Sequence, residues 1–153
     1  MPIPALLLSL IGLVPFIGCG LGAIGPQTGS SDPWLAALIG YAAVVLSFVG
    51  GVHWGLVLRD PDPPLKGARL GLAVVPLLLG WAALAAAATV AYWIALLVLI
   101  AGYILAIAAE HQGGQQGLLP QRYLWLRWTF TIVAVAMLTT VVTLRLLGQT
   151  IVF

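Results

Sequence analysis

Charged side chains are scarce in this chain. Of its 153 residues, 6 are Lys or Arg and 4 are Asp or Glu, which is 7% of the sequence. Soluble domains carry roughly 25% charged residues. Hydrophobic residues make up 62% of the chain, and the mean hydropathy is +1.13. The composition therefore excludes a soluble globular domain and indicates a membrane protein that crosses the bilayer several times.

Cysteine and clustered positive charge are also lacking. Cys19 is the single cysteine, which excludes an intramolecular disulfide and a cysteine-based metal cluster. The net charge is only +2 and no basic stripe exists, so nucleic acid is excluded as a partner. The first four residues contain no Lys or Arg, so we expect the apolar segment after them to be a retained helix rather than a cleaved secretory signal.

Long apolar runs dominate what is present. A helix needs about 20 apolar residues to cross the hydrocarbon core, and unbroken runs favour helices over the alternating strands of a barrel. Gly- and Pro-rich or charged segments separate the runs at 25–33, 59–64 and 110–117. The sequence thus predicts an all-α protein, a bundle of five transmembrane helices forming a single domain over 1–153. The spans are expected at about 3–24, 34–58, 70–89, 91–109 and 128–147.

Two further boundaries follow from helix length and polarity. One helix over 70–109 would be about 60 Å long, too long for one crossing, so a tight turn is predicted near 88–91. The segment 118–128 is expected to lie at the membrane interface.

The distribution of Lys and Arg predicts the orientation. Five spans place five of the six basic residues on one side and one on the other. Basic residues in short loops favour the cytoplasmic side. The N-terminus should therefore face the cytoplasm, or the matrix in a mitochondrion, with the C-terminus opposite. The residues are Arg59, Lys66, Arg69, Arg122 and Arg127 on the inner side and Arg145 on the outer side.

Small residues recur along the second span. Gly40, Ser47, Gly51 and Gly55, together with Ala36 and Ala43, fall on one helical stripe. Close packing of small residues drives helix association in lipid. The stripe is therefore expected to form the central helix contact of the bundle. Self-association through the Gly51–Gly55 face is the open alternative.

A few ionisable residues could carry chemistry. His53 is the one ionisable side chain well inside a span, and such groups in a membrane often mark function. Glu110 and His111 end the fourth span on the same side of the membrane. With Trp54 and Arg127 they form a candidate ligand or proton site. The alternative is a neutral His53 bonded to a neighbouring helix and a solvated helix end at Glu110.

Metal and cofactor chemistry stays open at this site. His53, Glu110 and His111, with Asp60 nearby, are candidate ligands for zinc or non-haem iron, and the two histidines could ligate haem. However, the sequence lacks the spacing of a metal motif, so no metal is assigned and any cofactor is unknown. Arg122 or Arg127 pairing with Glu110 is a further expectation.

A resemblance supports this outline. The segment Ser-Phe-Val-Gly-Gly-Val-His-Trp-Gly at 47–55 resembles the signature of an uncharacterised membrane family, that of domain of unknown function thirty-four twenty-nine. The segments 12–16 and 117–127 resemble two other stretches of that family. Glu110 stands where the family usually has Asp, and Arg122 where it often has Trp. The resemblance implies no known activity, and it implies the inner membrane of a bacterium or a mitochondrion.

Three functions are compared on these grounds. The lack of a nucleophile, metal cluster or cofactor motif favours a non-enzymatic accessory or assembly factor of an energy-converting membrane, in contact with lipid and with other membrane proteins. The alternative is a small-ligand, metal or proton-coupled carrier or binding protein using His53 and Glu110. An enzyme using His53 as a base ranks last.

Overall fold

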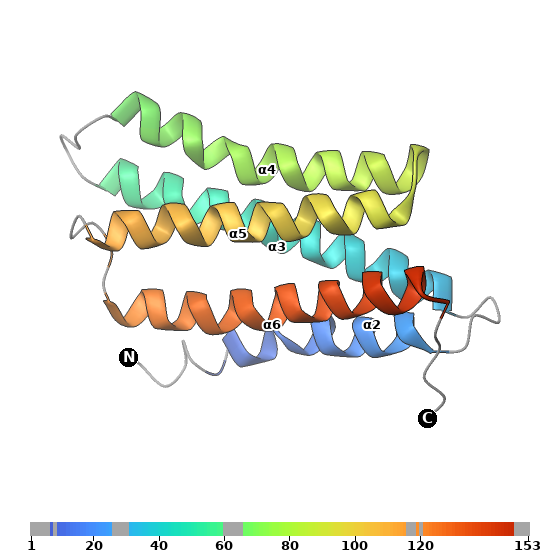
Figure 1. Cartoon of the computed structure of the whole chain (residues 1–153). Helices are drawn as coiled ribbons and strands as arrows, with labels where there is room; N and C mark the ends of the chain where they lie inside the picture. Colours follow the sequence, from blue (N-terminus) through green and yellow to red (C-terminus); the bar gives the residue numbers. More distant parts are fainter. Residues whose placement is uncertain are drawn as a thin grey trace.

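The computed structural model describes residues 7, 9–25, 31–59, 66–115, 119 and 121–148, and most of these residues are helical. Their order is α2 (Val14–Ile24), α3 (Ser31–Arg59), α4 (Lys66–Thr89), α5 (Tyr92–Gln115) and α6 (Gln121–Leu146) (Figure 1). The prediction of an all-α bundle of five apolar helices is confirmed.

Within the described residues, four helices are long and apolar enough to cross a membrane, and the apolar segment Ser9–Ile24 is shorter. α3 has 29 residues and α4 and α5 have 24 each, which corresponds to lengths of about 36–44 Å. The predicted first span begins in residues outside the described part. Its described portion has a turn at 12–13, and α2 starts next to Pro15, because proline suits the first helical turn.

Several helices continue beyond the apolar runs that predicted them. α4 begins at Lys66, α5 ends at Gln115 and α6 begins at Gln121. Residues 121–128, within the segment expected at the membrane interface, form the first two turns of α6. Their position at the interface remains a prediction. No Gly or Pro follows Gln121 in this stretch, so nothing interrupts the helix there. The predicted tight turn between α4 and α5 is confirmed at Val90 and Ala91, whose N–H groups both donate to the Ala86 carbonyl.

The helices run alternately in opposite directions, so the bundle has two polar ends. α3 contacts α2, α4 and α5, whereas α6 contacts α5 and α2. In Figure 1, α3 crosses behind α5 at an angle, with α4 on one side of the bundle and α2 and α6 on the other. We name the two ends after their buried charged residues, the Glu110 end and the Arg145 end. The turn between α4 and α5 lies at the Arg145 end.

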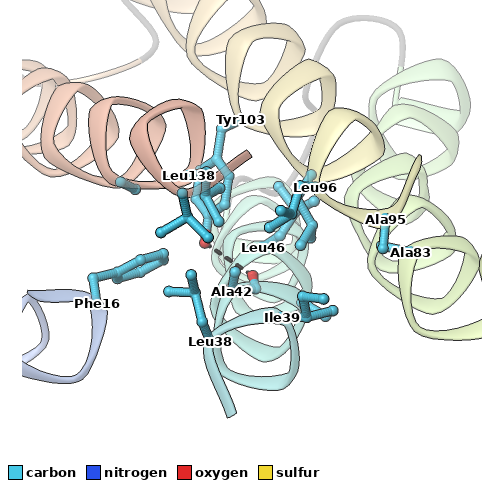
Figure 2. Close-up of a cluster of buried hydrophobic side chains, with 14 of the residues drawn as sticks. Phe16, Leu38, Ile39, Ala42, Leu46, Ala83, Ala95, Leu96, Tyr103 and Leu138 are labelled. Atoms are coloured by element: carbon cyan, nitrogen blue, oxygen red, sulfur yellow. Dashed lines mark hydrogen bonds between the residues drawn. The ribbon is translucent and has the colours of Figure 1, made fainter. Parts of the chain in front are cut away.

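The core is aromatic and aliphatic, with one buried internal hydrogen bond at its centre. Phe16 and Tyr103 are fully buried and meet edge to face at 6.0 Å. The Tyr103 hydroxyl donates to the Ala42 carbonyl of α3 at 2.9 Å (Figure 2). Lipid is as apolar as such a core, so close packing and satisfied hydrogen bonds hold the helices together. The aliphatic partners in Figure 2 include Leu38, Leu46, Leu96 and Leu138.

Small residues bring α3 and α4 together. A Cβ atom added at Gly80 would lie 2.8 Å from the Ala43 carbonyl oxygen and 2.8 Å from Ser47 Oγ. Gly50 lies against the Ala73 backbone in the same way. The contact face of α3 therefore follows Ala43, Ser47 and Gly50, at a spacing of four and three residues.

The other predicted packing glycines lie elsewhere. Among the described residues, no atom lies within 4 Å of a Cβ added at Gly40, Gly51 or Gly55. Of the predicted stripe, Ala43 and Ser47 lie at the contact with Gly80 of α4. The prediction is wrong for Gly40, Gly51 and Gly55 as contacts within the bundle. The seam passes through Gly50, and its neighbour Gly51 is turned about 100° away from it. Self-association through Gly51 and Gly55 remains a prediction.

Candidate functional site

Glu110 is a fully buried carboxylate near the end of α5. Arg127 of α6 faces it, and its Nε donates to Oε1 at 3.0 Å and to Oε2 at 2.9 Å. The Tyr123 hydroxyl, one turn earlier on α6, donates to Oε1 at 3.1 Å. Burying a lone charge is very costly, and a guanidinium with an added hydrogen bond offsets that cost. These three side chains therefore tie α5 to α6.

His53 of α3 completes the cluster. Its Nε2 lies 3.9 Å from Glu110 Oε1, which is too long for a hydrogen bond. Its Nδ1 lies 2.9 Å from the Val49 carbonyl oxygen. A carbonyl oxygen only accepts, so Nδ1 carries a hydrogen and Nε2 is the atom that can take up a proton. Protonation would direct a second N–H toward Glu110.

Two residues of the predicted site lie outside this cluster. Trp54 Nε1 donates to the Leu70 carbonyl of α4 at 3.2 Å. His111 is exposed, and its Nε2 lies 3.2 Å from Gln115 Nε2. Adjacent residues on a helix point about 100° apart, so Glu110 faces the bundle while His111 faces outward.

The structure therefore brings together only part of the predicted set. His53, Glu110 and Arg127 meet, and of the two arginines proposed as partners it is Arg127 that pairs with Glu110. Asp60, expected nearby, lies outside the described residues. Within the described ranges, no group of three or more His, Cys, Asp or Glu side chains is placed to hold a metal ion. Both Glu110 oxygens already accept hydrogen bonds from Arg127.

Tyr123 is a cluster member that sequence reasoning missed. Tyr123 and Arg127 are four residues apart, which places them on one face of a helix. This four-residue spacing is visible in the sequence. It places Tyr123 beside Arg127 only if the last helix begins near residue 121. A span that begins at 128 leaves both residues outside it.

A groove of about 360 Å³ adjoins the cluster, between α3 and α6 beside the residues that precede α2. Tyr123 and Arg127 belong both to its lining and to the cluster. The Tyr41 hydroxyl, which also lines it, donates to the Gly12 carbonyl at 2.7 Å. The remaining lining residues are Ser9, Gly12, Val45, Phe48, Val49, Val52, Leu126 and Phe130.

A second polar cluster lies at the Arg145 end. Arg145 is buried on α6, and its Nε donates to the Ala23 carbonyl of α2 at 2.9 Å. Its Nη1 donates to Asp32 Oδ1 at 3.1 Å, and its guanidinium carbon lies 5.6 Å from the ring centre of Tyr92. This arginine therefore joins four helices. From the sequence, Arg145 was used only to predict the orientation. Its partners Ala23 and Asp32 are more than 100 residues away in the sequence, so these contacts were not predicted.

Comparisons with known proteins find relatives among transmembrane proteins. The chain is similar to Transmembrane protein 69 of Xenopus tropicalis, at 41% identity over 85 residues, and to Transmembrane protein 69 of Mus musculus, at 38% identity over 85 residues. Each match covers 54% of this chain and 33% or 34% of the relative, so the chain spans about a third of the length that these proteins have. No solved structure matches. The family model described as "Protein of unknown function (DUF3429)" matches residues 1–143, and the chain therefore belongs to that family of membrane proteins.

Proposed function

We propose that this protein is a non-enzymatic accessory or assembly factor of an energy-converting membrane. The observation that carries the proposal is the pairing of Glu110 with Arg127, because both carboxylate oxygens accept hydrogen bonds from the guanidinium. A carboxylate bound in this way acts as a tie between helices rather than as a free reactive group. The buried hydroxyl of Tyr103 and the guanidinium of Arg145 are likewise engaged with backbone carbonyls of other helices.

We also propose which membrane holds the protein and which way the bundle faces. The protein acts as a single transmembrane domain in the inner membrane of a bacterium or mitochondrion, with the Glu110 end facing the cytoplasm or matrix. Arg69, Arg122 and Arg127 all lie toward that end, and basic residues favour the inner side. Large apolar side chains such as Phe48, Trp81 and Trp125 are exposed on the bundle, as contact with lipid or with apolar partner helices requires.

Cells that lack the protein provide the test. An accessory role predicts that the deletion lowers the amount of at least one assembled membrane complex, measured on native gels and by quantitative mass spectrometry. We expect both the wild type and the neutral pair Glu110→Gln with Arg127→Met to restore it. The pair removes both buried charges at once and so leaves no unpaired ion.

Two outcomes would contradict the accessory role. One is a deletion that changes no membrane complex. The other is a double variant, Glu110→Gln with Arg127→Met, that accumulates to the wild-type level and yet fails to restore the complex. That result would show that the function needs the charges of Glu110 and Arg127 and not only their contact.

Proton-coupled binding or transport is the second candidate, favoured by the 3.9 Å approach of His53 to Glu110. A proton carrier would speed the decay of a pH gradient across vesicles that contain the protein, followed with a trapped pH-sensitive dye. His53→Gln, which cannot titrate, would abolish that effect. If wild-type vesicles matched protein-free vesicles, the candidate would fail for proton movement by the chain alone.

A further inference from the structure

The groove beside Glu110 has the size and the wall of a lipid-binding site. Its volume of about 360 Å³ lies in the range of ligand pockets, roughly 300–1,000 Å³. Val45 and Val52 of α3 and Leu126 and Phe130 of α6 line it. Phe48 stands at its rim with 70% of its surface exposed. These walls match an acyl chain in chemistry.

Polarity in the groove is concentrated at one end. Tyr123 and Arg127 belong to the first two turns of α6, at the Glu110 end, whereas Tyr41 lies further along the groove and its hydroxyl already bonds to Gly12. Arg127 comes six residues after the start of α6, which is roughly 9 Å along the helix axis. A groove that is apolar along most of its length and has hydrogen-bond donors near a helix end matches a molecule with one polar, hydrogen-bond-accepting end.

Arg127 has donor capacity that Glu110 does not use. Both hydrogen bonds to the carboxylate come from Nε. Nη2 is buried and has no hydrogen-bond acceptor among the described residues. An unpaired buried donor is costly, and the planar guanidinium binds phosphate as readily as carboxylate. The exposed Arg122 and the positive N-terminal end of α6 add to the attraction for an anion.

We propose that this groove binds one anionic phospholipid from the surrounding leaflet, with an acyl chain along α3 and α6 and the phosphate at Arg127. The unused Nη2 donor of Arg127, the exposed cationic Arg122 on the same helix and the apolar walls favour this occupant. The inference goes beyond the accessory role, and either can fail without the other. A bound lipid would satisfy the spare donor and fix the spacing of α3 and α6 at this end.

A matched pair of variants on α3 tests the proposal. Val45→Phe adds bulk inside the groove, whereas Val44→Phe adds the same bulk one residue away, at an exposed position outside the lining. The full chain, purified in mild detergent and stripped of lipid, is titrated with palmitoyl-oleoyl phosphatidylglycerol and with the matching phosphatidylcholine. Native mass spectrometry counts bound lipids, and thermal melting shows that each variant is folded.

The expected result is one phosphatidylglycerol bound about tenfold tighter than phosphatidylcholine, a difference of about 1.4 kcal/mol. Val45→Phe should lose about tenfold in affinity for both lipids, whereas Val44→Phe should bind like the wild type. Arg127→Lys keeps a positive charge beside Glu110 but loses the planar donor group. It should bind both lipids equally.

Four results would overturn the proposal. The two valine variants could bind lipid alike, or the wild type could fail to prefer the anionic lipid. Inorganic phosphate alone could raise the melting temperature as much as phosphatidylglycerol does, which would point to free phosphate. Val45→Phe could instead dissociate a dimer without changing lipid affinity, which would make a second copy of the chain the occupant.

Discussion

The two ends of the bundle each bury an arginine of α6, but they pair it in different ways. At the Glu110 end the carboxylate is fully buried and depends on Arg127 for neutralisation. At the Arg145 end the guanidinium rests on a backbone carbonyl, and the Asp32 side chain is 77% exposed. Glu110 is therefore needed to neutralise Arg127. Asp32 only adds a partly solvated contact to Arg145, which is already bonded to a backbone carbonyl. A buried arginine can thus pair with a fully buried carboxylate at one end and with a mostly exposed carboxylate at the other.

Removing the buried acid should have the largest effect. Glu110→Ala leaves the Arg127 charge buried and unpaired, which costs about 3–5 kcal/mol of unfolding free energy. Unfolding in mixed detergent micelles, followed by circular dichroism, measures this cost. If the variant unfolded with the wild type, the buried pair would not stabilise the Glu110 end.

Truncating the other buried arginine should cost less. Arg145→Met leaves the Ala23 carbonyl without its donor, and a lost buried hydrogen bond of this kind costs about 1–3 kcal/mol. Arg122→Met, at an exposed position on the same helix, is the matched control and should change stability by no more than about 0.5 kcal/mol. Equal losses in the two variants would argue against a tie at the Arg145 end.

Loss of the tyrosine hydroxyl sharpens the account of the Glu110 end. Tyr123→Phe removes one hydrogen bond to the carboxylate while keeping the ring, and should cost about 1.5 kcal/mol. The loss should shrink when Glu110 is already Gln, because a neutral amide accepts more weakly than a carboxylate. The same micelle unfolding assay tests this. If Tyr123→Phe lowered the unfolding free energy equally with Glu110 and with Gln at position 110, the hydroxyl would not stabilise the protein through its bond to the carboxylate.

The exposed acid should matter least. Asp32→Asn weakens a pair whose acid is mostly in water, which costs about 0–1 kcal/mol and less at high salt. Unfolding measured at low and high salt checks both parts. A loss as large as that of Glu110→Ala would erase the distinction between the two ends.

The helices could be predicted from the sequence because apolar length alone determines which segments cross a bilayer. The pair of Arg127 and Glu110 was also among the expectations, since few ions exist to pair. The rotation of α3 was not predictable, because Gly50 and Gly51 look equivalent in the sequence and only the packing against Ala73 distinguishes them. The contacts of Arg145 were hidden for a similar reason. Its main acceptor is a backbone carbonyl, which no residue type reveals.

The central claim is that Glu110 and Arg127 form a buried ion pair between α5 and α6, and that removing either residue alone destabilises the other. A double-mutant cycle with Glu110→Gln and Arg127→Met, read as unfolding free energy in micelles, tests it most directly. The account predicts that the double variant is more stable than either single variant, because it buries no unpaired charge. If the two single losses simply add in the double variant, Glu110 and Arg127 act independently and the account is contradicted.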